Sequence, residues 1–133
     1  MEIRKATMSD YVSICRSLQN KKIDYQTPKH AKADIQKQAM YVLVDNGKIL
    51  AQCSLIEEPA HNYTAIKRLC IYNKKNCGKG IAEQFIKFFV QNAETQLGCT
   101  PWEDNGAMRH LLEKNGFTFR YTFLGCYCFY LRA

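Results

Sequence analysis

The stretch IYNKKNCGKGIA, residues 71–82, decides the fold of this chain. A strand-forming run ends there, a polar loop with two glycines follows, and a helix with periodic apolar residues begins. The N–H groups that open a helix have no partner within it, and together with the helix dipole they favour an anion. Gly78 and Gly80 remove the Cβ atoms that would keep a phosphate from the backbone. The stretch therefore predicts a phosphate-binding loop.

Two well-known phosphate loops do not fit this stretch. A Walker A loop ends in Gly-Lys-Ser or Gly-Lys-Thr, and residues 78–81 read Gly-Lys-Gly-Ile. The dinucleotide-binding fingerprint needs a third glycine at an offset where this chain has none. On the loop alone, an ordinary glycine turn before a helix remains the alternative.

Working outward from the loop, apolar periodicity and turn residues predict a mixed α/β chain. Residues 45–47, Asp-Asn-Gly, predict a hairpin between two strands. Gly98 is expected to stop the helix that follows the loop, and Asp104 or Asn105 to cap the next one. We expect strands over residues 2–6, 40–44, 49–56, 63–72, 99–102, 117–123 and 126–131. We expect helices over residues 11–18, 30–38, 79–97 and 105–115, and loops over 20–29 and 57–62.

Two segments resemble the GNAT superfamily of N-acetyltransferases. Residues 77–82 are similar to its pyrophosphate loop, Gln/Arg-x-x-Gly-x-Gly/Ala, with Gly80 and Ala82 at the small positions and Cys77 in place of Gln or Arg. Residues 104–117 resemble its helix Asn-x-x-Ala/Met, which ends in Glu-Lys-x-Gly-Phe. The resemblance implies one α/β (α+β) domain over residues 1–133 with the GNAT acyl-CoA N-acyltransferase fold. Its sheet is expected to be mixed and mostly antiparallel, flanked by helices, with splayed central strands at 63–72 and 99–102.

The resemblance also implies transfer of an acetyl group from acetyl-CoA directly to a primary amine. Backbone groups of the strand before the loop would hold the pantetheine arm and the thioester, and the loop would hold the pyrophosphate. The residues implied to bind the co-substrate are Leu69, Cys70, Ile71, Cys77, Gly78, Lys79, Gly80, Ile81, Ala82 and Asn105.

The general acid and base are less clear. Many members of the family place a tyrosine acid where this chain has Leu112, which cannot donate a proton. Candidates for the base are Glu57, Glu58 and His61, and candidates for the acid are His110 and Tyr127; solvated or packed side chains are the alternative for each. Because Cys77 and Leu112 depart from the family pattern, a CoA-binding module without catalysis is the alternative function.

Charge and composition restrict the partners. The chain carries 19 Lys and Arg against 12 Asp and Glu, a net charge of +7, which favours an anionic partner such as CoA. The charges are scattered and no nucleic-acid-binding motif is present, so nucleic acid is not expected. No apolar run approaches the ~20 residues of a membrane span.

The cysteines and aromatic residues complete the expectations. Seven cysteines without CxxC spacing indicate reduced, mostly buried thiols of a cytoplasmic protein and no metal centre. Trp102 could line the co-substrate cleft or lie in the core, and the core is the expectation. The tyrosines and phenylalanines of the last strands would suit either a homodimer or the core. Residues 21–32 carry several lysines near the region that would shape the acceptor pocket, and the acceptor itself cannot be identified from the sequence.

Overall fold

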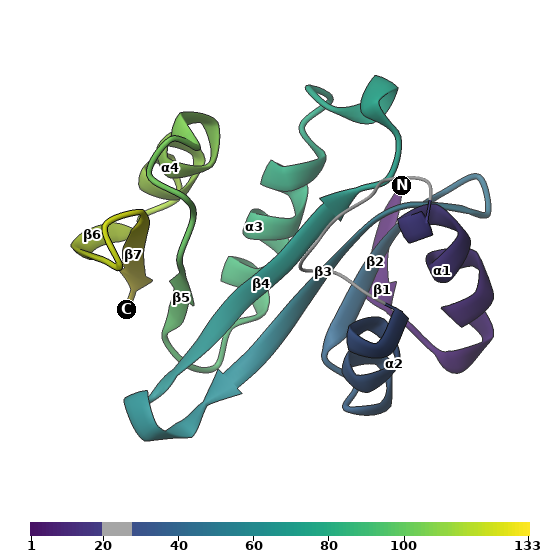
Figure 1. Ribbon diagram of the computed structural model, residues 1–133, viewed down its shortest axis with the longest axis horizontal. Coiled ribbons are helices and arrows are strands. Elements are labelled where there is room, and N and C mark those ends of the chain that lie inside the picture. Colours follow the sequence, from purple (N-terminus) through teal and green to yellow (C-terminus); the bar gives the residue numbers. More distant parts are fainter. Residues whose placement is uncertain (20–27) are drawn as a thin grey trace. The chain divides into compact units, whose positions relative to one another are not determined.

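The structure is a computed structural model that describes residues 1–19 and 28–133 (Figure 1). Within these residues the elements follow the predicted order β-α-α-β-β-β-α-β-α-β-β. The strands are β1 Glu2–Lys5, β2 Met40–Asp45, β3 Lys48–Glu58, β4 Tyr63–Ile71, β5 Leu97–Cys99, β6 Thr118–Phe123 and β7 Tyr127–Arg132. The α-helices are α1 Tyr11–Gln19, α2 Pro28–Gln36, α3 Ile81–Asn92 and α4 Gly106–Lys114.

The strands of the described residues form one sheet in the order β1-β2-β3-β4-β5-β7-β6. The β4–β5 pair is parallel, while β1–β2, β2–β3, β5–β7 and β6–β7 are antiparallel. The expectation of a mixed, mostly antiparallel α+β sheet is therefore confirmed. The hairpin predicted at residues 45–47 joins β2 to β3, with Asn46 and Gly47 both at positive φ, as a two-residue hairpin loop requires.

The chain forms two compact units. The first comprises Met1–Leu55 and Arg68–Phe85. In it, apolar residues of α1 and α2 pack against β2 and the end of β4, so these helices cover one face of the strands (Figure 1). The core residues of this layer are Ala6, Ile14, Leu18, Ala31, Ile35, Met40, Val42 and Cys70.

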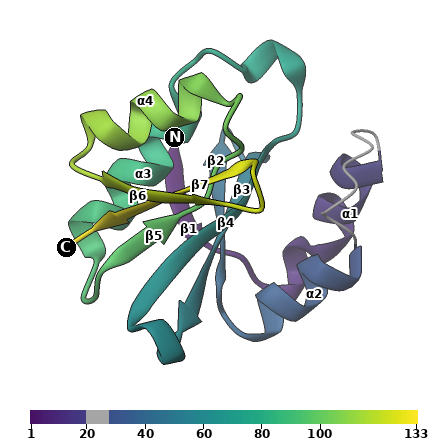
Figure 2. The same cartoon turned by 60° about the vertical axis from the view of Figure 1, so that its left-hand side comes forward.

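The second unit comprises Ile56–Lys67 and Ile86–Ala133, and it contains the β6–β7 hairpin beside β5 (Figure 2). The buried Tyr130 ties β7 to α4, because its hydroxyl donates to Glu113 at 3.0 Å and accepts from Arg109 at 3.2 Å. Arg132 donates to the carbonyl of Asn115 at the end of the same helix. The expectation of one domain over residues 1–133 stays a prediction.

Several sequence expectations are wrong, among them the strand expected over residues 99–102, since β5 covers Leu97–Cys99. The helix after the loop ends at Asn92, and Leu97 and Gly98 belong to β5, where they pair with β4 and β7. The second helix begins at Pro28, which suits the first helical position because proline has no N–H to leave unpaired. Trp102 is 50% exposed and contacts Tyr127 by its ring. The part of the predicted loop at residues 20–27 lies outside the described residues.

The cysteines are less buried than expected. Cys53, Cys70 and Cys128 are buried, whereas Cys77 is exposed and the others are intermediate. No disulfide joins cysteines among the described residues. In the same part of the chain, no helix is long and apolar enough to cross a membrane.

Asp10 makes the first unit sensitive to acid. Its carboxylate accepts from Arg4 at 2.8 and 3.0 Å and from the Thr7 N–H at 2.8 Å. The hydrogen bond from Arg4 lowers the Asp10 pKa, against the opposing effect of burial. Because the folded pKa lies below the unfolded value of ~3.9, the stabilisation is complete above that value and is lost as the pH falls through the folded pKa.

We therefore expect Asp10→Asn to lower the free energy of unfolding at neutral pH. The difference in free energy of unfolding between the variant and the parent should become smaller in acid. Urea unfolding of both proteins at about pH 7 and about pH 3 measures the two gaps. A gap of the same size at both pH values would contradict the assignment.

Candidate functional site

The loop between β4 and α3 is built by short-range hydrogen bonds. Asn73 caps a 3-10 turn over Lys74–Asn76 by accepting the Lys75 N–H at 3.1 Å. The Cys77 N–H then donates to the Lys74 carbonyl at 3.1 Å. Asn76 is buried at 7% exposure and accepts from the ammonium of Lys79 at 3.4 Å. These contacts give the loop a defined path before its two glycines.

Gly78 and Gly80 both adopt the left-handed backbone region, with φ of 81° and 78°. A Cβ placed on either glycine would meet no atom of the described structure within 4 Å. Within the described residues, the space beside the Cα of each glycine is therefore open to a bulky group. This is the geometry that a diphosphate requires at a helix start.

Helix α3 begins immediately after these glycines and is held firmly. The Gly80 carbonyl accepts the Gln84 N–H at 3.0 Å, so Gly80 stands at the N-cap. Ile81, Phe85 and Phe89 are buried, and they anchor the apolar side of the helix. The first-turn N–H groups and the positive end of the helix dipole therefore lie directly after the glycine loop.

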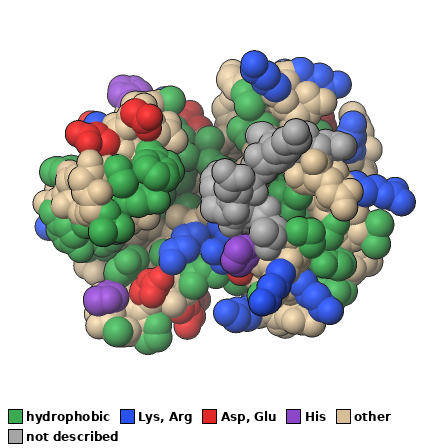
Figure 3. Space-filling model, viewed as in Figure 1, with side chains coloured by type: hydrophobic (Ala, Val, Ile, Leu, Met, Phe, Trp, Pro, Cys, Tyr) green, Lys and Arg blue, Asp and Glu red, His purple; other side chains and the backbone are tan. Residues whose placement is uncertain are grey.

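The loop itself carries positive charge. Lys74, Lys75 and Lys79 are exposed. Figure 3, viewed as in Figure 1, shows Lys and Arg side chains at the top, where Figure 1 places the loop between β4 and α3. Cys77 is exposed next to Gly78. Glycine backbone, helix dipole and lysines together fit the phosphates of CoA.

The end of β4 leads into this loop in the same unit. Cys70 is buried in the core beneath α1 and α2, while Leu69 and Ile71 are half-buried. The adjacent hydroxyl of Tyr72 donates to Oε1 of the fully buried Gln52. Burial raises the Tyr72 pKa far above its usual range, so this phenol stays protonated at neutral pH.

Arg68 of β4 and its partner Asp34 of α2 were not predicted as site residues. Arg68 lies within β4 but has a φ of 57°, and its guanidinium forms a two-point ion pair with Asp34 of α2. Asp34 is 2% exposed, and it also accepts from Ser54 of β3 at 2.8 Å. In the sequence, the two adjacent basic residues Lys67 and Arg68 inside a strand-forming run were the available sign that β4 carries polar contacts.

The predicted bases lie in the second unit. Glu58 forms an ion pair with Lys67 at 3.1 Å, whereas Glu57 is exposed. His61 ends a 3-10 turn over Pro59–His61, is exposed, and lies with its ring 6.3 Å from that of Tyr63. Their proposed roles stay predictions.

The predicted acids and Asn105 also lie in the second unit. His110 is exposed on α4, and the Tyr127 ring packs between Trp102 and Phe123 with centroid distances of 4.4 and 5.4 Å. Asn105 caps α4 by accepting the Met108 N–H at 3.2 Å. Leu112 is fully buried, so it takes a core position. Among these residues, Tyr127 and Leu112 have packing roles and Asn105 has a capping role.

Cys99 is not suited to act as a nucleophile. Burial raises the pKa of its thiol to about 12, so thiolate is scarce at neutral pH.

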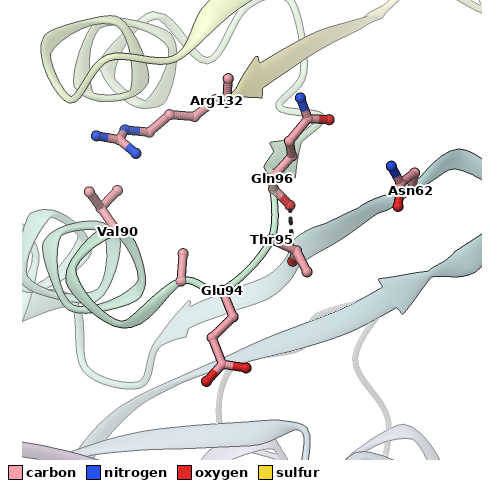
Figure 4. Close-up of a pocket in the computed structure, with 8 residues that line it drawn as sticks. Asn62, Val90, Glu94, Thr95, Gln96 and Arg132 are labelled. Atoms are coloured by element: carbon pink, nitrogen blue, oxygen red, sulfur yellow. Dashed lines mark hydrogen bonds between the residues drawn. The ribbon is translucent and has the colours of Figure 1, made fainter.

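A pocket of about 510 Å³ lies elsewhere, at the C-terminal end of α3 (Figure 4). Figure 4 shows Arg132 extending from β7 toward Val90 of α3, while Glu94 points away from both. None of the predicted site residues in the described chain lines it. Because a helix C-terminus carries partial negative charge, this end of α3 does not suit a diphosphate. Its lining residues are Asn62, Val90, Ala93, Glu94, Thr95, Gln96, Arg132 and Ala133.

Comparisons with known proteins find the same architecture. No protein-family model and no curated protein matches the sequence. A GNAT-family acetyltransferase from Streptococcus agalactiae matches by structure with a TM-score of 0.78, at 20% identity, over 98% of this chain and 94% of that one. One from Bacillus cereus has a TM-score of 0.79, at 14% identity, over 98% and 94%.

A third solved structure is a complex with coenzyme A. It is a ribosomal-protein α-N-acetyltransferase in complex with coenzyme A, with a TM-score of 0.76 and 18% identity, over 98% of this chain and 92% of that one. These matches extend across nearly the whole length of both chains in each comparison. At such identities they establish the architecture of the polypeptide. The chain therefore has the fold of the GNAT acetyltransferases.

Proposed function

We propose that this chain transfers an acetyl group from acetyl-CoA to a primary amine. The observation that carries the proposal is the open glycine loop before α3, in a chain with this fold. Gly78 and Gly80 leave the backbone accessible, and lysines surround it. The structural neighbour bound to coenzyme A supports the choice of co-substrate.

The first unit supplies the parts that would bind the donor. Backbone N–H groups of residues 78–82 would hold the pyrophosphate, with Lys79 contributing charge. The backbone of Leu69–Ile71 would hold the pantetheine arm and the thioester carbonyl. A backbone donor at that carbonyl would stabilise the negative charge that develops as the amine attacks. The amine must first lose a proton, so transfer should speed up as the pH rises toward the amine pKa.

The acceptor is an amine of unidentified class. Solved neighbours include acetyltransferases named for spermidine, for a ribosomal protein and for phosphinothricin, so the shared fold does not select among them. The direct test is to mix the protein with acetyl-CoA and a library of polyamines, peptides, aminoglycosides and amino acids. Release of free CoA with a particular amine supports the proposal, and no release with any amine counts against catalysis.

A CoA-binding module without turnover is the second candidate. Leu112 favours it, because this buried leucine cannot protonate a leaving thiolate. Calorimetry separates the two functions: binding of CoA with no turnover supports the module, and absence of CoA binding contradicts both.

The loop cysteine provides a test of the donor site. Cys77 is exposed and stands where the related pattern has Gln or Arg. We expect Cys77→Arg to tighten CoA binding by roughly three- to tenfold, because a guanidinium at an exposed site adds a charge-assisted hydrogen bond to phosphate. Isothermal titration calorimetry measures the change. Cys77→Ser is the matched control and should leave the affinity unchanged; equal affinities of all three proteins would argue against phosphate binding beside residue 77.

A further inference from the structure

Arg68 has a left-handed backbone inside a β-strand. Its φ is 57°, whereas regular strand residues have negative φ. A residue with a side chain rarely adopts this region, because its Cβ crowds the neighbouring carbonyl oxygen. Such residues persist where the surrounding structure holds them, and they gather at functional sites. Arg68 directly precedes Leu69, the first of the strand residues proposed to hold the donor.

Asp34 is the group that holds Arg68. Its Oδ2 accepts from Nε and its Oδ1 accepts from Nη2, both at 2.8 Å. Oδ2 also accepts from the Ser54 hydroxyl at 2.8 Å, so both carboxylate oxygens are engaged. A two-point pair fixes the plane of a guanidinium as well as its position. With Asp34 only 2% exposed, α2 and β3 together fix the side chain of Arg68.

The location of Arg68 gives this ion pair a consequence for the backbone. The parallel register between β4 and β5 covers Thr64–Ile66. Arg68 follows two residues later, and a left-handed residue interrupts the regular alternation of a strand. The direction in which the peptide groups of Leu69–Ile71 point therefore depends on the conformation at Arg68. Stabilisation of a developing charge requires donors that are fixed in advance.

We infer that Asp34 is a positioning residue for the thioester-binding backbone of β4. This inference rests on the proposed function and goes one step deeper into the same site. Asp34 acts through Arg68: the ion pair keeps Arg68 left-handed, and that conformation directs the backbone groups of Leu69–Ile71 toward the thioester carbonyl. The loop at residues 78–82, which would bind the pyrophosphate, does not depend on the pair.

The first test compares Arg68→Gly with Arg68→Ala. Both remove the guanidinium, but glycine adopts a positive φ without steric cost and alanine does not. We expect Arg68→Gly to keep kcat within about threefold of the parent and Arg68→Ala to lose at least about tenfold. The dissociation constant for CoA should change less than about threefold in both, because the pyrophosphate loop is untouched. Equal kcat values for the two variants would overturn the inference.

The second test is a rescue. Asp34→Asn should lower kcat at least about tenfold, and adding Arg68→Gly should restore it to within about threefold of the Arg68→Gly single variant. The double variant also removes the half-buried arginine charge that would otherwise lack its partner. Thermal unfolding shows whether each protein is folded. If Asp34→Asn does not fold, the comparison of Arg68→Gly with Arg68→Ala still tests the inference. A folded double variant without rescue would overturn the inference.

Binding measurements separate this inference from the proposed function. Calorimetry of the parent with acetyl-CoA and with CoA comes first, and a parent that binds neither contradicts the proposed function. For a parent that binds without turnover, the readout is the preference for acetyl-CoA over CoA, which reports the thioester contact. Arg68→Gly should keep that preference and Arg68→Ala should lose it. The role of Asp34 would be overturned if the parent showed no preference for acetyl-CoA over CoA. It would also be overturned if both variants showed the same preference.

Discussion

A Gly80→Asp variant should bind CoA roughly 10- to 100-fold more weakly than the parent, because the new carboxylate would lie where the phosphates approach. Two unit charges 4 Å apart repel by about 4 kcal/mol at an effective dielectric of about 20, and exposure to water reduces that figure. Gly80 is open, with no atom within 4 Å of an added Cβ, so the side chain enters the space above the loop. Calorimetric titration with CoA measures the loss.

Gly47→Asp is the matched control for this change. Gly47 has a φ of 75°, close to the 78° of Gly80, and a Cβ there also meets no atom within 4 Å. Both variants therefore impose a similar backbone cost and add the same charge within the first unit. We expect a similar loss of thermal stability in both, with CoA affinity reduced in Gly80→Asp alone. Equal CoA affinities of the two variants would show that the loop is not part of the proposed donor site.

The second large effect concerns stability of the second unit. Gly98→Ala should lower the free energy of unfolding by about 1–3 kcal/mol, because the interior has no room for the added methyl group. A Cβ on Gly98 would lie 2.6 Å from two ring carbons of Tyr63 and 3.2 Å from the ring of Phe129. The Tyr63 ring packs against Phe129 at a centroid distance of 5.4 Å, which limits its retreat. Urea unfolding gives the change in free energy.

Two further variants test the cause. Gly106 is the first residue of α4, and a Cβ there meets nothing within 4 Å. Gly106→Ala should therefore be neutral or stabilise the protein by up to about 1 kcal/mol. Tyr63→Ala removes the ring that would clash. In a double-mutant cycle, Gly98→Ala should therefore cost less in the Tyr63→Ala background than in the parent. Additive effects would show that the cost arises elsewhere than at this contact.

Much of the fold was predictable because the decisive residues act on their neighbours along the chain. Asn46 and Gly47 adopt the positive φ values of a tight hairpin, whatever lies far away in sequence. Asn105 caps α4 through an N–H only three residues ahead. The glycines of residues 78–80 shape the loop before α3 through their own backbone freedom. The resemblance of two short motifs then indicated the architecture that the structural neighbours show.

The errors have a common origin. Leu97 continues the apolar spacing of α3, so local periodicity extended that helix too far. In the structure Leu97 pairs with Thr64 and Arg132, residues distant in sequence. Gly98 is needed for its lack of a Cβ beside Tyr63, not to stop a helix. Trp102 lies outside the core, since its ring rests on Tyr127 at the surface of the unit.

The sequence by itself determined the order of the elements and the place of the glycine loop, since turns, caps and helical periodicity arise from residues close together in the chain. The tertiary structure alone decided that Asp34 meets Arg68, 34 positions away, and holds it in a left-handed conformation. The physical reason is that a buried charge needs a partner wherever the fold can supply one. Local preference at Arg68 favours an ordinary strand, and the ion pair with Asp34 overrides it.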